Sequence, residues 1–299
     1  MTVGFVHLRV HSEYSLVDGL LRIPELVSAV AERNMGAVAL TDQSNLFGMV
    51  KFYRAAVSRG IKPIIGCDAW LAPSADDSAP TRLGLLCMDE TGYRNLARLV
   101  TRSYTEGQQQ GRALLREEWL TEEACVGLIA LSGAREGDVG RALLAGRPEE
   151  ARAAVSRWRR LFPERYYLEI QRTGRNSEEA HVAAAVELAA SEGLPLVATN
   201  DVRFLAASDF EAHEARVCIN QGHTLSDPRR PREYHEQQYL RSPEEMAALF
   251  PDLPEALANT VEVARRCTVE LRLGESYLPD FPVPEGDTTE SYLRKTASA

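Results

Sequence analysis

The sequence predicts an α/β protein whose mainly parallel sheet closes, or nearly closes, into a barrel. Short apolar runs with strand character alternate with helical patterns through most of the chain, as is typical of βαβ units. Seven such runs occur within roughly 200 residues, and this number favours a closed barrel over an open sheet. In barrels of this kind, reactive side chains gather at the carboxyl ends of the strands and in the loops that follow.

The strand and helix candidates follow one another in a regular order. The predicted strands are VGFVHLRV (3–10), GAVALT (36–41), IKPIIGCDAWL (61–71), RLGLLCM (82–88), VGLIALS (126–132), YYLEIQ (166–171) and LPLVATN (194–200). The predicted helices between them cover residues 23–34, 45–60, 91–104, 148–162 and 177–193.

Helical patterns dominate from about residue 206 onward. The prolines and arginines of 227–238 interrupt them, and we interpret that basic stretch as a solvated loop. Closely spaced prolines in YLPDFPVPEGD (277–287) indicate a linker, because proline disfavours both helices and central strands. We expect one domain at 1–275, then a linker and the truncated start of a following region at 276–299, as if the chain were cut inside a longer protein.

Composition and charge restrict the possible functions. The formal net charge is −9, which disfavours direct DNA binding, because phosphate binding normally requires a basic face. The amino terminus lacks the pattern of a signal peptide, and no apolar run is long enough to span a membrane. The five cysteines are scattered and never form a CxxC motif, which indicates reduced thiols. These features predict a cytoplasmic protein.

The first predicted strand places His7, Arg9 and His11 at alternating positions, and so on one face. Two imidazoles on one face suggest a metal site, whereas a guanidinium between them argues against one. Further polar residues lie at or near the ends of other predicted strands. Several carboxylates at one barrel mouth require positive charge, which a metal cluster or arginines would supply. These further residues are Asp18, Gln43, Asp68, Asp201 and Arg203.

In their order along the chain, HLRVHS, TDQSN, GCDAW, LSGAREGD and TNDVRF resemble the motifs of the PHP (polymerase and histidinol phosphatase) domain family. Longer stretches, such as FVHLRVHSEYSLVDGL and PEALANTVEVARRC, are similar to the N-terminal PHP domains of bacterial replicative DNA polymerase III alpha subunits of proteobacterial type. The resemblance covers essentially the whole chain. It implies a distorted seven-stranded (β/α) barrel of PHP type, with extra helices and a C-terminal linker.

The resemblance also implies the positions of a metal site. Metal-binding family members hold divalent ions with nine ligands, of which this sequence keeps four and replaces five. Arginine only donates and stays protonated, so it cannot ligate a cation. We therefore predict a vestigial site in which guanidinium groups take the place of metal ions. The four retained positions are His11, Asp18, Asp68 and Asp201. The five replaced positions are Arg9, Gln43, Arg82, Ala134 and Arg203.

Three hypotheses about function follow. In the first, the chain is a catalytically silent scaffold that supports the polymerase and docks the proofreading 3′–5′ exonuclease subunit beside other subunits of the holoenzyme. It then needs no cofactor, and magnesium belongs to a polymerase region outside it. In the second, the four retained ligands hold one ion for weak phosphoesterase or pyrophosphatase activity. The third, a free-standing enzyme similar to histidinol phosphatase, is disfavoured by the lost ligands.

Overall fold

The computed structural model describes residues 4–73, 79–276, 278 and 280–298. The chain divides into two compact units, Met1–Val269 and Glu270–Ala299. In the described residues of the second unit there is one helix, α10 (Thr289–Ala297), which begins after a capping box formed by Thr288 and Ser291. Tyr277 and Pro279 of the predicted linker lie outside the described residues.

The first unit is an α/β domain, and the predicted class is confirmed. Its strands belong to one mixed sheet in which β2 contacts β1, β3 and β5. The remaining pairs are β3 with β6, β6 with β7, β7 with β8, and β4 with β5. The strands are β1 (Ala37–Leu40), β2 (Lys62–Leu71), β3 (Thr81–Cys87), β4 (Gln108–Gln109), β5 (Arg112–Leu115), β6 (Leu128–Leu131), β7 (Tyr166–Gln171) and β8 (Leu196–Thr199).

The N-terminal segment, residues 5–11, connects the two ends of this sheet. On one side, the Ala39 and Thr41 amides donate to the carbonyls of His7 and Val10. On the other side, Val202, three residues beyond the end of β8, pairs in parallel with Val10. Together with the strand pairs of β1, β2, β3, β6, β7 and β8, these bonds form a closed ring of seven extended segments.

The N-terminal segment is nevertheless not a regular strand, unlike the prediction from its alternating pattern. Two of its backbone amides bond to side chains instead of a neighbouring strand. The Val6 amide donates to the Thr260 hydroxyl at 3.0 Å, and the Val10 amide donates to the Thr41 hydroxyl at 2.9 Å. Each of these bonds interrupts the ladder of backbone bonds that defines a strand.

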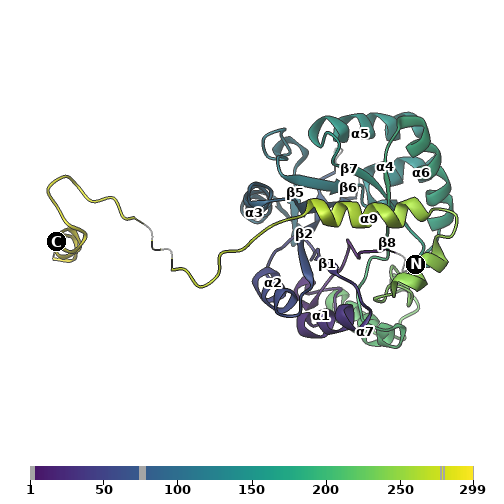
Figure 1. Cartoon of the computed structure of the whole chain (residues 1–299), viewed down its shortest axis with the longest axis horizontal. Helices are drawn as coiled ribbons and strands as arrows, with labels where there is room; N and C mark the ends of the chain where they lie inside the picture. The colour runs from purple at the N-terminus through teal and green to yellow at the C-terminus, as the bar shows by residue number, and fades with distance from the viewer. Residues whose placement is uncertain (1–3, 74–78, 277, 279, 299) are drawn as a thin grey trace. The chain divides into compact units, whose positions relative to one another are not determined.

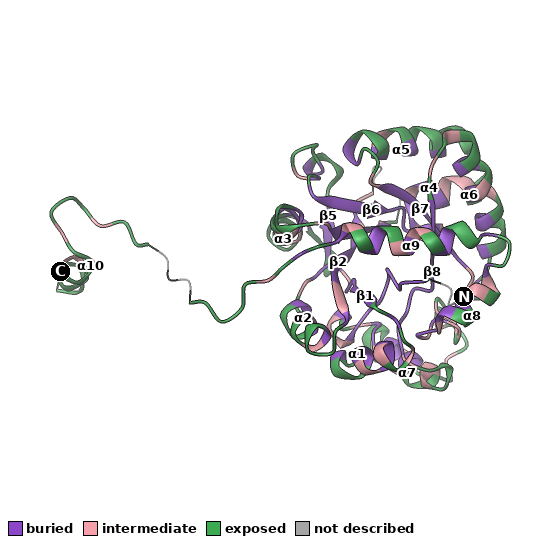
Figure 2. Cartoon of the chain, viewed as in Figure 1, coloured by how far each residue is buried: buried purple, intermediate pink, exposed green. Residues whose placement is uncertain are grey.

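Helices surround the strands, with buried faces turned inward and exposed outer faces (Figures 1 and 2). Helix α9 (Pro254–Arg266) lies across the ring, where Val263, Ala264 and the following Cys267 pack on Val6 and Leu8 in the main hydrophobic core. The other described helices of this unit are α1 (Ile23–Glu32), α2 (Met49–Ser58), α3 (Glu90–Thr105), α4 (Asp138–Leu144), α5 (Pro148–Leu161), α6 (Glu178–Glu192), α7 (Phe210–Gln221) and α8 (Pro243–Leu249).

The structure differs from the prediction in the direction of one strand and in the number of elements. The expected pairing was mostly parallel, but β3 runs antiparallel to both β2 and β6. A short connection joins β2 to β3, and a short connection permits antiparallel pairing, whereas a parallel pair needs a longer crossover. The sequence patterns also missed the β4–β5 hairpin and the seven-residue helix α4.

Among the described residues, no helix combines the length and the apolar character needed to cross a lipid bilayer.

Candidate functional site: a buried cluster of arginines and carboxylates

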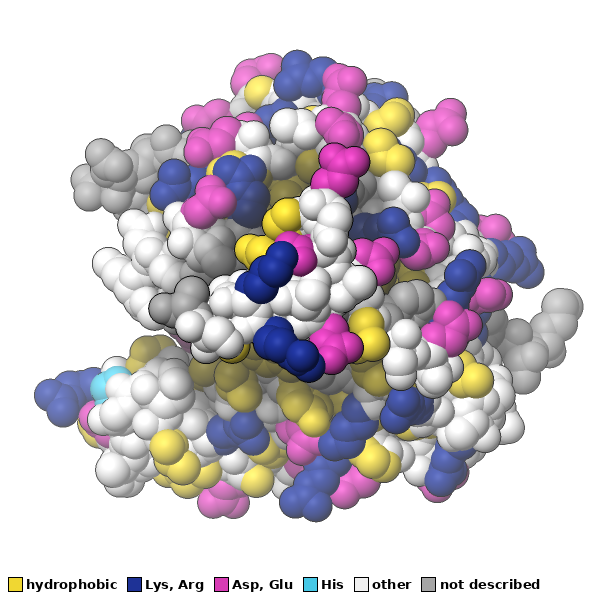
Figure 3. All heavy atoms as spheres, turned by 90° about the vertical axis from the view of Figure 1, so that its left-hand side faces the viewer, with side chains coloured by type: hydrophobic (Ala, Val, Ile, Leu, Met, Phe, Trp, Pro, Cys, Tyr) yellow, Lys and Arg dark blue, Asp and Glu magenta, His cyan; other side chains and the backbone are white. Residues whose placement is uncertain are grey.

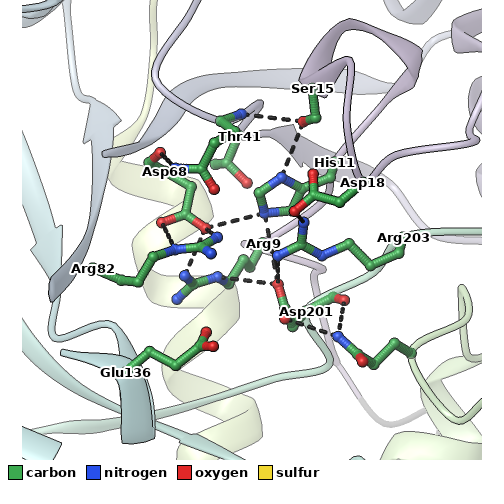
Figure 4. Close-up of polar contacts among 12 residues, drawn as sticks. Arg9, His11, Ser15, Asp18, Thr41, Asp68, Arg82, Glu136, Asp201 and Arg203 are labelled. Atoms are coloured by element: carbon green, nitrogen blue, oxygen red, sulfur yellow. Dashed lines mark hydrogen bonds and ion pairs between the residues drawn. The ribbon is translucent and has the colours of Figure 1, made fainter. Parts of the chain in front are cut away.

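A cluster of charged side chains fills one end of the ring, where several strands end (Figure 4). Arg9 and His11 come from the N-terminal segment, and Asp68 comes from the last part of β2. Arg82 lies near the start of β3. Because β3 is antiparallel, its start lies beside the end of β2, and Trp70 pairs with Arg82. The strand direction therefore explains how a residue at the start of a strand reaches this end of the ring.

Asp68 lies at the centre of the cluster and is fully buried. Its Oδ2 accepts a hydrogen bond from Arg9 Nη2 at 2.6 Å, and its Oδ1 accepts one from Arg82 Nε at 3.1 Å. Arg82 Nη2 also donates to Oδ2, and His11 Nε2 lies 3.1 Å from the same oxygen. One carboxylate thus contacts two guanidinium groups and an imidazole.

Arg9 links three carboxylates and is 2% exposed. Besides Asp68, it donates from Nη1 to Glu169 Oε2 at 2.7 Å, and its Nε lies 3.3 Å from Asp201 Oδ1. The other oxygen of Glu169 accepts from the Thr199 hydroxyl at 2.5 Å and the Gln171 amide at 3.0 Å. The guanidinium therefore lies where its donors reach acceptors on several sides.

Arg203 holds the other side of the cluster. Its Nη1 lies 2.5 Å from Asp18 Oδ2, and its Nη2 donates to Asp201 Oδ1 at 2.9 Å. The Tyr234 hydroxyl donates to Asp18 Oδ2 at 2.8 Å, and the Arg203 guanidinium lies over the Tyr234 ring. Asp201 Oδ2 also accepts from Gln238 Nε2 at 2.8 Å. The backbone of Asp201 has a φ of +43°, a conformation uncommon for residues other than glycine.

The arginines determine the ionisation of these carboxylates. Burial alone would raise the pKa of Asp68, but the charges of Arg82 and Arg9 outweigh burial and hold this pKa far below its usual value. For Asp201, burial is likewise outweighed by Arg203, Arg9 and then Arg175, so its pKa is also low. The cluster therefore contains ionised carboxylates and permanently charged guanidinium groups, as a buried network requires.

The structure brings together most of the predicted site residues. Arg9 and Arg203 both contact the predicted aspartates, as the replacement hypothesis requires. Gln43 contributes differently, because its side-chain amide donates to the backbone carbonyl of Asp68 at 2.7 Å. Ala134 is buried and offers no polar side-chain atom.

His7 does not join the cluster, although alternation placed it on one face with Arg9 and His11. Its Nε2 donates to the backbone carbonyl of Arg241 at 2.9 Å, and its ring packs edge-on against Phe5. Burial lowers the pKa of His7 to about 4, so this imidazole is neutral at pH 7. The irregular backbone of the N-terminal segment is the reason why strict alternation does not hold.

Sequence reasoning missed several residues of the cluster, of which four show why. Glu169 stands inside the apolar strand YYLEIQ, and this unusual position was the available signal. Arg175 contacts Asp201 at 3.3 Å from a loop that carried no signal. Tyr234 and Gln238 belong to the stretch interpreted as a solvated loop, yet both contact buried aspartates.

The same cluster contains three side chains of the types that ligate metal ions. His11, Asp68 and Asp201 offer ligand atoms that all lie within 4.8 Å of one another. However, the oxygens of both aspartates already accept bonds from guanidinium groups. Placing a divalent cation among three positive charges at short range is electrostatically unfavourable. The arrangement of donors therefore does not fit a metal cluster of the PHP type.

An α/β ring with charged and polar side chains gathered at one end defines a class of protein, and comparison with known families identifies that class. The chain belongs to the PHP domain family, whose model matches residues 7–173. This match includes seven of the nine predicted site positions, while Asp201 and Arg203 lie beyond it.

Full-length relatives give a finer comparison. The chain is 56% identical to the "DNA polymerase III subunit alpha" of Pseudomonas aeruginosa over 98% of its own length and 25% of that protein. It is 52% identical to the protein of the same name from Escherichia coli K12, with the same shares covered. The chain thus spans about a quarter of the length of these relatives. A solved structure of an amidohydrolase from Chromobacterium violaceum is 15% identical, with a TM-score of 0.46, over 71% of this chain and 96% of that one.

Proposed function

We propose that this chain is the N-terminal PHP domain of a bacterial replicative DNA polymerase alpha subunit, and that it acts in DNA replication in the cytoplasm. The support is the identity of about one half to alpha subunits over 98% of the chain. Residues 1–275 form the domain in this proposal, and 276–299 begin the connection to the polymerase region. The nucleotidyl transfer chemistry and its magnesium belong to that region, outside this chain.

Within the alpha subunit, the domain is a catalytically silent scaffold. The observation that carries this proposal is the buried network in which Asp18, Asp68 and Asp201 each contact an arginine. A metal-dependent hydrolase needs these carboxylates for its ion and an open position for water. Here guanidinium groups fill the coordination positions, so the network contributes stability instead of catalysis.

The partner in this proposal is the proofreading 3′–5′ exonuclease subunit, alongside other subunits of the polymerase. DNA is not a direct partner of this domain. The net charge of −9 supports this, as does the face in Figure 3, where basic and acidic side chains are interspersed instead of separated. Purified chain is therefore expected to bind duplex DNA weakly at physiological salt and to incorporate no nucleotides.

The docking proposal is tested with purified subunits. We expect the 299-residue chain to co-elute with the exonuclease subunit in size-exclusion chromatography. The full-length alpha subunit should bind the exonuclease as well, whereas an alpha subunit lacking residues 1–275 should not. Unchanged binding by the shortened subunit, with its polymerase activity intact, would place the docking surface elsewhere and contradict the proposal.

The silent-scaffold proposal also predicts the metal content. After purification without chelators, elemental analysis should find no stoichiometric zinc, manganese or iron, because arginines occupy the coordination positions. The alternative function is a weak phosphoesterase or pyrophosphatase with a single ion, and the proximity of His11, Asp68 and Asp201 favours it. That alternative predicts one ion per chain, lost together with phosphoester hydrolysis in His11→Ala. Finding such an ion would refute the silent scaffold.

A further inference from the structure

A cavity of about 300 Å³ lies beside the buried cluster, under the loop formed by residues 227–238. Its other walls come from the segment before α6 and from α7, through residues such as Gly174 and Phe210. The cavity is large enough for a phosphate group together with a small organic part. None of the nine predicted site positions lines it.

The loop over the cavity is fixed in place by three contacts. The Tyr234 hydroxyl bonds to Asp18, and Arg230 forms a partly buried ion pair with Glu214 on α7. At Gly174, an added Cβ would lie 2.9 Å from the His235 ring, so the absence of a side chain allows the loop to approach closely. Because these contacts hold both walls, the cavity is largely pre-formed.

The charges around the cavity are unbalanced. Of its four lining arginines, Arg175 is neutralised by Glu178 and Asp201, and Arg230 is neutralised by Glu214. The other two, Arg135 and Arg232, have no carboxylate partner among the residues that the structure describes. Of these, Arg135 donates to the backbone carbonyl of Asn176. The opposing charge in the lining is the carboxylate of Glu233, which has no cationic partner within the described part of the chain.

We propose that this cavity binds a small phosphate-bearing ligand, with Arg135 and Arg232 as the groups that contact the phosphate oxygens. A guanidinium group presents parallel N–H donors that match the spacing of phosphate oxygens. Tyr234, His235 and Phe210 add three aromatic rings to the lining, which suit the flat ring system of a nucleotide. This inference does not depend on the scaffold function or on any partner protein.

Isothermal titration calorimetry of the 299-residue chain tests the proposal with three probes. Inorganic phosphate, pyrophosphate and AMP are titrated separately at low salt and again at 0.5 M NaCl. We expect saturable binding of at least one probe that weakens as salt increases. If AMP binds more tightly than both inorganic probes, the aromatic rings contact the nucleotide base. If an inorganic probe binds more tightly than AMP, the cavity recognises the phosphate group alone.

Three variants distinguish this cavity from other anion sites. The double variant Arg135→Ala with Arg232→Ala should bind about tenfold more weakly or worse, because two charged hydrogen-bond donors are lost. Glu233→Gln should bind more tightly, because the opposing charge is removed. The control is Arg229→Ala, which alters an 86% exposed arginine of the same loop that does not line the cavity.

Circular dichroism spectra and melting curves confirm that each variant is folded before titration. The proposal is overturned if no probe binds at millimolar concentration. It is also overturned if the double variant binds as tightly as the unchanged chain, or if Arg229→Ala weakens binding as much as the double variant does.

Discussion

Arg9→Ala is expected to destabilise the domain by about 3–5 kcal/mol at pH 7, which is the typical cost of removing one partner from a buried ion pair. For a domain of this size, the melting temperature should fall by roughly 10 °C. The reason is that Arg9 contacts Asp68, Glu169 and Asp201 while being 2% exposed. Its removal leaves three buried carboxylates with fewer donors and less positive charge, and it also leaves a cavity.

The size of this effect should depend on pH. The pKa values of Asp68 and Asp201 are lowered in the folded protein, so the stability they contribute is present above their unfolded pKa of about 4. That stability is lost as the pH falls from there toward the folded pKa. Without Arg9, the carboxylates take up protons more readily. The difference in stability between Arg9→Ala and the unchanged chain should therefore narrow as the pH falls toward and below about 4.

Denaturant unfolding followed by circular dichroism at several pH values measures both effects. The matched control is Arg94→Ala, which removes an arginine of an exposed i,i+4 pair with Glu90. Surface pairs contribute little, so this control should change stability by less than about 1 kcal/mol at every pH. Equal losses for Arg9→Ala and Arg94→Ala would show that the buried network is not a major source of stability.

The α/β fold class was predictable because the hydrophobic periods of strands and helices are clear in most segments of the sequence. It could not show that β3 runs antiparallel, since an apolar strand such as RLGLLC has no feature that depends on direction. The N-terminal segment shows another limit of periodicity. Its pattern alternates, but the hydroxyls of Thr41 and Thr260 accept its backbone amides, and this depends on contacts distant in sequence.

The site was predictable where a charged residue interrupted an apolar strand or followed one. Arg9, Asp68 and Arg203 satisfied this condition, and the structure joins them in one network. Arg175 and Tyr234 could not be found in this way, because their loops contain many polar residues. Which of those polar residues turns inward is decided by the three-dimensional course of the loop, here through contacts with Asp201 and Asp18.

Asp68→Leu should be at least as damaging as Arg9→Ala, because it removes the carboxylate that contacts both Arg9 and Arg82. Two buried guanidinium groups would then repel each other, and their loss of a shared partner should cost about 3–5 kcal/mol. Arginine cannot relieve this cost by losing its proton, so the loss should persist from pH 5 to pH 9. This behaviour contrasts with Arg9→Ala, in which the remaining carboxylates can be protonated.

A second substitution separates the charge effect from the loss of packing. In the double variant Asp68→Leu with Arg82→Met, one buried pair is replaced by apolar side chains, and such replacements are often neutral or stabilising. The methionine keeps contact with Trp70, whose ring lies 4.5 Å from the Arg82 guanidinium. The double variant should therefore recover part of the stability that Asp68→Leu loses, giving a coupling energy of about 1–3 kcal/mol in the double-mutant cycle. The cycle compares the stability losses of the single variants Asp68→Leu and Arg82→Met with that of the double variant. If the two single losses simply add, Asp68 and Arg82 do not interact energetically. The idea that guanidinium groups replaced metal ions as partners of these carboxylates then loses its basis.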